Sequence, residues 1–134
     1  MLVDTTFVVD LLRERRRGQH GPATATLAAH RSVKLRMPLF VRCELEAGAR
    51  RAAFPERELQ RIARLGDFIE LVLPGPDFAS RYGQTEAHLR AQGTMIPTMD
   101  LLIAALCIGV GEPLLTSDDH FRRIPHLVVV PFNR

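Results

Sequence analysis

The stretch LVDTTFVVDLLRERRR, residues 2–17, contains the structural unit from which we expect the whole chain to be built. Leu2 and Val3 are typical of the end of a buried strand. Apolar residues then recur at helical spacing, at Phe7, Val8, Leu11 and Leu12. A strand that leads directly into an amphipathic helix favours an α/β architecture.

The same alternation of strand and helix continues along the rest of the chain. Further strands are predicted at 33–38, 68–73, 113–117 and 126–131. Helices are predicted at 5–17, 23–31, 38–53, 56–65, 77–92, 98–107 and 119–124, with Asp77 and Thr98 as N-caps. We therefore expect one α/β domain over residues 1–134, with a mainly parallel central sheet flanked by helices on both faces.

The composition sets limits on the class of protein. Hydrophobic residues make up 46% of the 134 residues, which is enough for a core at this length. The longest apolar run is too short to span a bilayer, and the first residues do not form a signal peptide, so a cytoplasmic location is expected. Cys43 and Cys107 have no zinc-ligand spacing and are predicted to be buried apolar residues.

The basic residues are compatible with a nucleic-acid partner. The net charge is +3, and Lys34 is the only lysine among the 18 basic residues. Arginines cluster within 13–17 and 50–64, and arginine favours bidentate phosphate contacts. A solvated helix surface explains the same clusters equally well, so charge alone does not establish the partner.

Four carboxylates carry most of the functional information. Asp4, Glu44, Asp100 and Asp118 each lie where a short apolar segment meets a turn or a helix start. Carboxylates are costly to bury without a partner, and a divalent cation would offset their repulsion if the fold brings them together. Asp4 and Asp118 follow predicted strands directly, at the edge where open α/β sheets bind ligands.

Each of these carboxylates also has a structural interpretation. Asp4 is able to cap the helix that follows it, and Asp100 lies in a first helical turn, where negative charge is favoured. Glu44 is able to pair with a basic neighbour on an exposed helix face. Asp118 is predicted to belong to the site and the adjacent Asp119 to cap the short helix, and a swap of these two roles stays open.

Other titratable residues are predicted to lie outside the site. Glu46 is expected to pair with Arg50 on a helix surface, and Asp10 is expected to be structural, with Arg13 at pairing distance. The histidines show no metal-ligand spacing. His120 is the one nearest to the proposed site, but no direct role is predicted for it.

Four segments together resemble PIN-domain ribonucleases, and most of all the VapC toxins of bacterial toxin–antitoxin pairs. LVDTTFVVDLL resembles the family's opening strand, Asp-Thr-Ser and helix, with Thr6 where serine is more usual. RCELEAGARR resembles its Glu-Leu-x-x-Gly helix, and PTMDLLIAAL its Asp-x-x-Ile-Ala-Ala segment. LLTSDDHFRRI resembles its Thr-x-Asp-x-x-Phe segment, and the four follow in the family's order over almost the whole chain.

The resemblance implies an Mg²⁺- or Mn²⁺-dependent endoribonuclease that acts as the toxin of a type II toxin–antitoxin pair. Asp4, Glu44, Asp100 and Asp118 match the family's acidic, metal-binding positions, and Thr6 and Thr116 match its accompanying hydroxyl positions. The implied partners are RNA, a VapB-type antitoxin and a second copy of the chain. A catalytically inactive PIN-like module that binds RNA or a protein remains the alternative.

The expected chemistry agrees with that resemblance. Phosphodiester hydrolysis requires an activated water and an offset for charge on the phosphate oxygens, and a hard cation held by carboxylates supplies both. Asp4 and Asp118 are predicted to approach the metal most closely. Glu44 and Asp100 would act through waters or hold a second metal, and the choice of RNA target stays open.

Overall fold

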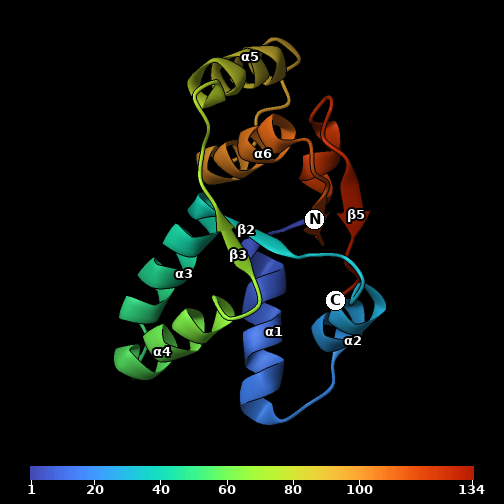
Figure 1. Ribbon diagram of the computed structural model, residues 1–134. Helices are drawn as coiled ribbons and strands as arrows, with labels where there is room; N and C mark the ends of the chain where they lie inside the picture. Colours follow the sequence, from blue (N-terminus) through green and yellow to red (C-terminus); the bar gives the residue numbers. More distant parts are fainter.

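The computed structural model describes residues 1–134, and its centre is a five-stranded sheet in which every strand pair is parallel (Figure 1). The strand order is β3-β2-β1-β4-β5. The strands are β1 (Leu2–Val3), β2 (Arg36–Pro38), β3 (Glu70–Val72), β4 (Leu114–Thr116) and β5 (Val129–Pro131). The predicted α/β class is confirmed, and the sheet is wholly parallel rather than mainly so.

Six α-helices and one short 3₁₀ helix connect the strands. They are α1 (Thr5–Arg17), α2 (Pro22–Ala29), α3 (Leu39–Arg50), α4 (Pro55–Leu65), α5 (Phe78–Ala91), α6 (Thr98–Val110) and η1 (Asp119–Arg123). Right-handed crossovers on a sheet of this order place α1 to α4 on one face and α5, α6 and η1 on the other. Figure 1 shows α5 and α6 on the opposite side of the sheet from α1, α2 and α4.

The middle of the sheet is the most deeply buried part of the core. β1 and β4 pair in register at Leu2 with Leu114 and at Val3 with Leu115, and all four residues are fully buried. Each such side chain contributes roughly 1.5–3 kcal/mol by leaving water. β1 and β4 therefore end side by side, and the residues that follow them are held at one edge of the sheet.

α6 covers this centre with a helix that is apolar almost all round. Six of its residues are buried, namely Leu101, Ile103, Ala104, Ala105, Leu106 and Cys107. The helix begins after Pro97 and ends at Gly111, whose φ of 70° gives the left-handed turn that ends many helices. Its first turn carries Asp100 to the same edge of the sheet as Asp4.

Some local predictions were wrong. Cys43 is exposed, because it lies on the outer face of α3, whereas Cys107 is buried and burial raises the pKa of its thiol. Pro97 and not Thr98 is at the N-cap of α6, and Asp77 takes the N-cap position of α5 without a side-chain hydrogen bond.

None of the helices is both long and apolar enough to cross a membrane.

Candidate active site

Asp4 lies at the base of the site, between the end of β1 and the start of α1. Its side chain is almost fully buried, and its Oδ1 accepts a hydrogen bond of 2.8 Å from the backbone N–H of Phe7. Asp4 therefore caps α1, as one of the sequence interpretations held. Capping uses one carboxyl oxygen and leaves Oδ2 directed toward the end of β4.

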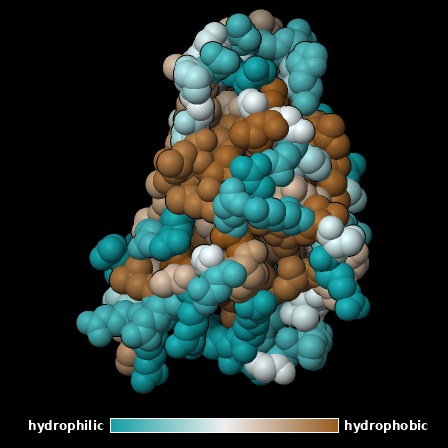
Figure 2. Space-filling view, in the orientation of Figure 1, coloured by the Kyte–Doolittle hydropathy of each residue, from teal (hydrophilic) through white to brown (hydrophobic).

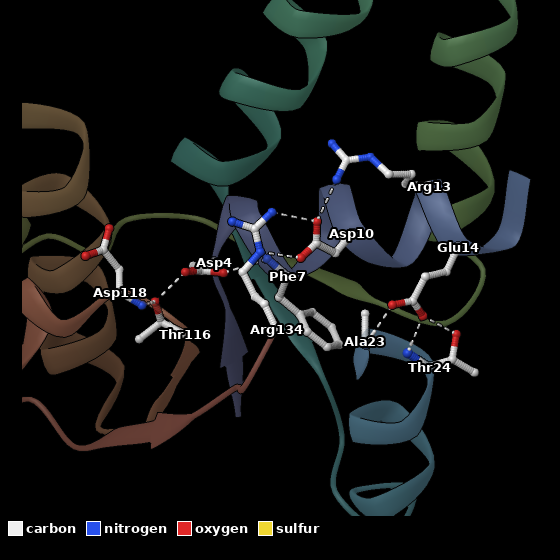
Figure 3. A network of polar contacts seen from close by, with 10 residues as sticks. All are labelled: Asp4, Phe7, Asp10, Arg13, Glu14, Ala23, Thr24, Thr116, Asp118 and Arg134. Atoms are coloured by element: carbon white, nitrogen blue, oxygen red, sulfur yellow. Dashed lines mark hydrogen bonds and ion pairs between the residues drawn. The ribbon is translucent and has the colours of Figure 1, made fainter. Parts of the chain in front are cut away.

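Thr116, the last residue of β4, connects Asp4 to Asp118. Its buried hydroxyl donates to Oδ2 of Asp4 and accepts a hydrogen bond of 3.0 Å from the backbone N–H of Asp118 (Figure 3). The hydroxyl thus orients the buried carboxyl and the turn that follows the strand. The hydrogen bond between Thr116 and Asp4 is possible because β1 and β4 pair in parallel, so that both strands end on the same side of the sheet.

Asp118 and Asp100 meet across a histidine. His120 Nε2 is 2.9 Å from Oδ2 of Asp100, and its Nδ1 is 2.9 Å from Oδ1 of Asp118. One ligand atom from each of the three residues lies within 4.8 Å of the other two. The neighbouring Asp119 is 90% exposed and pairs with Arg122, and it is Asp118 that caps η1.

Glu44 and Thr6 lie at the margins of the cluster. Glu44, on α3, accepts a hydrogen bond of 2.6 Å from the hydroxyl of Thr5, the residue that follows Asp4. It also lines a groove between α1, α3 and α4. Thr6 lines an open depression together with Asp118. The fold thus brings Asp4, Asp100, Asp118 and Thr116 together, with Glu44 one hydrogen bond away through Thr5.

The electrostatics of the cluster disfavour its charged state. Burial raises the pKa of Asp4 from its usual 3.8 to about 6. Hydrogen bonds from Thr116 and Phe7 lower this pKa, whereas the charges of Asp118 and Asp100 raise it further. Burial also raises the pKa of Asp100, although His120 acts against the shift. The charge of Asp118 raises the pKa of Asp100 as well, so the three carboxylates form one electrostatic unit.

The sequence interpretation missed His120 and Thr5 as parts of this site. His120 lies two residues after Asp118, and the tight turn of η1 returns its ring to that carboxylate. The signal in the sequence was the spacing Asp-x-His directly after a buried strand. Thr5 gave no signal of its own, because its role depends on where α3 packs against α1.

Oxygen donors in this arrangement fit a hard divalent cation. Asp4, Asp100 and Asp118 have no lysine or arginine ion pair, and the imidazole of His120 contacts Asp100 and Asp118. Carboxylate oxygens are the ligands that Mg²⁺ and Mn²⁺ prefer, and an imidazole nitrogen is an acceptable ligand for several transition metals. Buried carboxylates without a cationic partner are costly, so a bound cation would relieve a real electrostatic strain.

Comparison with known proteins places the chain in a family. A model of the PIN domain family matches residues 1–127. The chain belongs to the PIN domain family. This match covers nearly the whole chain, so the resemblance seen in the four sequence segments is confirmed.

One curated relative of this PIN-domain protein is named Ribonuclease VapC19, from Mycobacterium tuberculosis strain H37Rv. It is 33% identical over 130 residues, which cover 94% of this chain and 95% of the relative. The alignment therefore covers nearly the full length of both proteins.

Solved structures share the fold over the same extent. The VapBC2 complex of Rickettsia felis, bound to a promoter DNA fragment, contains a chain with a TM-score of 0.88 and 20% identity, with 98% of each chain covered. The VapBC-1 structure from nontypeable Haemophilus influenzae gives a TM-score of 0.85 at 23% identity, with 99% of this chain and 98% of that chain covered. At such identities the likeness establishes the fold.

Proposed function

We propose that this PIN-domain protein, one domain over residues 1–134, is a metal-dependent endoribonuclease that acts as the toxin of a type II toxin–antitoxin pair. The observation that carries the proposal is the set of three converging carboxylates, Asp4, Asp100 and Asp118, held at the carboxyl edge of the sheet without an arginine or lysine partner. The curated relative named as a ribonuclease supports the reaction class.

The residues that would hold the cation are Asp4, Asp100 and Asp118, with Glu44 acting from the margin. A divalent cation bound there, Mg²⁺ or Mn²⁺, would lower the pKa of a water and offset the charge on the phosphate. Asp4 supplies one oxygen from a position locked by the N-terminus of α1 and by Thr116. This rigidity matters because a hydrolytic site must keep its ligands in place while the substrate changes shape.

The hydroxyl and imidazole groups prepare the carboxylates for this role. Thr116 fixes the direction of the Asp4 carboxyl, and His120 separates Asp100 from Asp118 at hydrogen-bonding distance from both. Thr5 holds Glu44 toward the site. Thr6 lines the depression beside Asp118, where it is able to hydrogen-bond a bound water or an RNA oxygen.

The proposed protein partner is a VapB-type antitoxin. The similar structures from Rickettsia felis and Haemophilus influenzae are described as VapBC structures. A groove of about 270 Å³ between α1, α3 and α4 offers a binding surface, with apolar walls that include Leu12, Leu45 and Ile62. Glu44 lies in the same groove, so a segment bound there would reach the margin of the acidic site.

We also propose a homodimer, as the family resemblance implies. Figure 2 shows hydrophobic residues gathered over α6 and beside it. Leu73 and Val110, which follow β3 and end α6, are 62% and 38% exposed. This apolar surface is where we expect a second copy to pack. Light scattering on the purified protein would test the dimer, and a monomer at micromolar concentration would contradict it.

The experiment that tests the function is cleavage of end-labelled structured RNAs by the antitoxin-free protein, in Mg²⁺, Mn²⁺ or EDTA. Cuts at defined positions that require the metal and are lost in Asp4→Asn would support the nuclease. Asn keeps the shape of the side chain and an oxygen that can accept the bond from Phe7. Full activity in this variant or in EDTA would reject the proposed mechanism.

A negative result is also informative, provided that growth is measured. If no RNA in the panel is cleaved, expression of the wild-type chain and of Asp4→Asn in a bacterial host separates two explanations. Growth arrest relieved by the substitution means that the true substrate was absent from the panel. Normal growth together with RNA binding would favour the alternative, a PIN-like module that binds without cleaving.

A further inference from the structure

Arg134 reaches the acidic site from the segment that follows β5. Its Nε lies 2.8 Å from Oδ2 of Asp10, and its Nη2 lies 3.1 Å from Oδ1. This is a bidentate ion pair, the strongest kind that a guanidinium makes with a carboxylate. Asp10, on α1, is almost buried and also pairs with Arg13 at 3.2 Å. Asp10 therefore has an ion pair with Arg13 that does not depend on Arg134.

The guanidinium forms part of the wall of a depression that opens beside the site. This depression has a volume of about 420 Å³, and it is lined by Thr6, Ser117, Asp118, Phe132, Asn133 and Arg134. Figure 3 shows the guanidinium between the carboxyls of Asp4 and Asp10. The bond to Asp10 and the charges of Asp10 and Asp4 raise the pKa of Arg134, which places it in the field of the acidic cluster.

The ion pair leaves several donors of Arg134 free. A guanidinium carries five N–H groups, and the pair with Asp10 uses the Nε and Nη2 atoms. The side chain is 54% exposed, so its remaining N–H groups are accessible to a molecule bound in the depression. A planar group held on one side by a carboxylate and open on the other is suited to a phosphate.

Phe132, rather than Arg134, holds the chain after β5 in place. Phe132 is buried and packs edge-on against Phe7, with ring centroids 5.3 Å apart. Its backbone N–H also donates to the carbonyl of Thr116 at 2.9 Å. The segment is thus fixed beside β4 without Arg134, and the position of the guanidinium at the site calls for a different explanation.

We propose that Arg134 binds a backbone phosphate of the RNA held in this depression, with Asp10 as the residue that positions it. The inference rests on the proposed nuclease function. An acidic cluster repels a polyanion, and a fixed positive charge at its margin would offset that repulsion where the phosphate must lie. Phosphate contacts position a nucleic acid without reading its sequence, so the effect should be similar for different RNAs.

The test measures binding and catalysis separately. Binding of a fluorescein-labelled single-stranded RNA of 20 nucleotides is measured at several salt concentrations, in the background of Asp4→Asn to prevent cleavage. Arg134→Gln should weaken binding roughly tenfold and reduce the salt dependence by about one phosphate contact. In the active protein, Arg134→Gln should raise KM by a similar factor, and Arg134→Lys should restore part of the loss because it keeps the charge.

Two further variants separate a phosphate contact from a structural ion pair. Arg13→Gln removes the other ion pair of Asp10, and it should change neither KM nor the salt dependence. Asp10→Asn should raise KM by less than Arg134→Gln, because the charge remains but its position is no longer fixed. If Arg134→Gln lowers the melting temperature but leaves KM and the salt dependence unchanged, the inference is wrong. If Arg13→Gln has the same effect as Arg134→Gln, a diffuse basic surface is responsible and the inference is also wrong.

The experiments distinguish failure of the Arg134 phosphate contact from failure of the proposed nuclease function. Metal-dependent cleavage that is lost in Asp4→Asn but unaffected in Arg134→Gln would retain the nuclease and reject only the phosphate contact. Absence of any cleavage by the wild-type protein, with normal growth of the host, would remove the nuclease itself.

Discussion

Acidic residues lie at both ends of the strands of the parallel sheet, which we call the amino edge and the carboxyl edge. Those at the amino edge are paired with lysine, arginine or the N-terminal amino group, and those at the carboxyl edge are not. At the amino edge, Glu112 lies just before β4 and pairs with the amino group of Met1 at 2.9 Å and with Arg36. Glu70 begins β3 and pairs with Lys34 and Arg36. At the carboxyl edge, no lysine or arginine forms an ion pair with Asp4, Asp100 or Asp118. Asp100 and Asp118 contact His120, and Asp4 accepts hydrogen bonds from Phe7 and Thr116.

The pKa values follow this difference in partners. Burial acts to raise the pKa of Glu112, but the amino group of Met1 and the guanidinium of Arg36 lower it overall. The pKa of Asp4 is raised to about 6 because burial outweighs the hydrogen bonds from Thr116 and Phe7. An acidic residue that is fully paired stabilises the fold, whereas one left without a cation costs stability and is retained for another purpose.

The largest expected difference between the two edges is in catalysis. Asp118→Asn should slow RNA cleavage about a thousandfold, because a metal-assisted reaction depends on several kcal/mol of charge stabilisation. The side chain is 47% exposed, so the fold should survive, as circular dichroism would show. Rates of cleavage under single-turnover conditions measure the effect.

Glu112→Gln is the matched variant at the other edge. It removes the same charge but should leave the cleavage rate within twofold while lowering the free energy of unfolding by about 1–2 kcal/mol. A large loss of activity in Glu112→Gln would contradict the claim that only the acidic residues of the carboxyl edge serve cleavage.

The second expected effect is on stability and has opposite signs at the two edges. In metal-free protein at pH 7.5, Asp4→Asn should raise the free energy of unfolding by up to about 3 kcal/mol, because burial raises the pKa of Asp4 from 3.8 to about 6. The neutral amide avoids the cost of ionising a buried acid. Urea denaturation of the two variants and the wild type measures the change.

The pH dependence sharpens the same prediction. The pKa of Asp4 is raised in the folded state, so its contribution to stability is fully present below pH 3.8 and is lost as pH rises through about 6. The gain from Asp4→Asn should therefore grow between pH 4 and pH 7. Glu112 has a lowered pKa, so its contribution is present above pH 4.5 and is lost as pH falls below that. A gain from Asp4→Asn that is equal at pH 4 and pH 7.5 would contradict the assignment.

A smaller effect is expected from the metal itself. Mn²⁺ or Mg²⁺ at ten times its dissociation constant should stabilise the folded protein by about 1.4 kcal/mol through mass action. Thermal denaturation with and without EDTA measures the shift. Asp118→Asn should abolish it and Glu112→Gln should retain it. Equal shifts in both variants would place the binding site somewhere other than the carboxyl edge.

The last expected effect, similar in size to that of the metal, tests the hydroxyl that joins Asp4 to Asp118. Thr116→Val should destabilise the protein by about 1–2 kcal/mol and slow cleavage roughly tenfold, because the Asp4 carboxyl loses its donor. Thr85 is a matched control, since it is buried and its hydroxyl donates to the carbonyl of Arg81 at 2.9 Å. Thr85→Val should leave the cleavage rate unchanged. Equal rates for the two variants would mean that Thr116 only supports packing.

Most of the architecture was accessible from the sequence because the helical and strand patterns are strong and separated by glycine and proline. Every predicted strand and helix is present, with boundaries that differ by a few residues at most. The N-caps were less predictable. Pro97 precedes α6 with an extended backbone, so the helix begins without a side-chain bond from Thr98. The exposure of Cys43 depends on how α3 is rotated against the sheet, which periodicity alone did not determine.

The proximity of the site residues was predictable only where a strand ends. Asp4 and Asp118 follow two strands that pair in parallel, and Thr116 ends one of them, so the proximity of these residues follows from the sheet. The position of Glu44 depends on a hydrogen bond from Thr5, and that of His120 depends on the tight turn of η1. Arg134 and Asp10 are 124 positions apart, and no local pattern could have paired them.

The strand order also has a consequence for the moment at which the site forms during synthesis. The bond between Thr116 and Asp4 joins residues 112 positions apart, so it is among the most non-local contacts of the chain. The N-terminal part of a chain is synthesised first, so β1 is made long before β4. Asp4 and Asp118 come together only after β4 has been synthesised and has paired with β1. The groove between α1, α3 and α4 is built from residues between Val9 and Ile62 and is complete in the nascent chain much earlier. A growing chain therefore contains every residue of the groove proposed to bind the antitoxin before it has an acidic site.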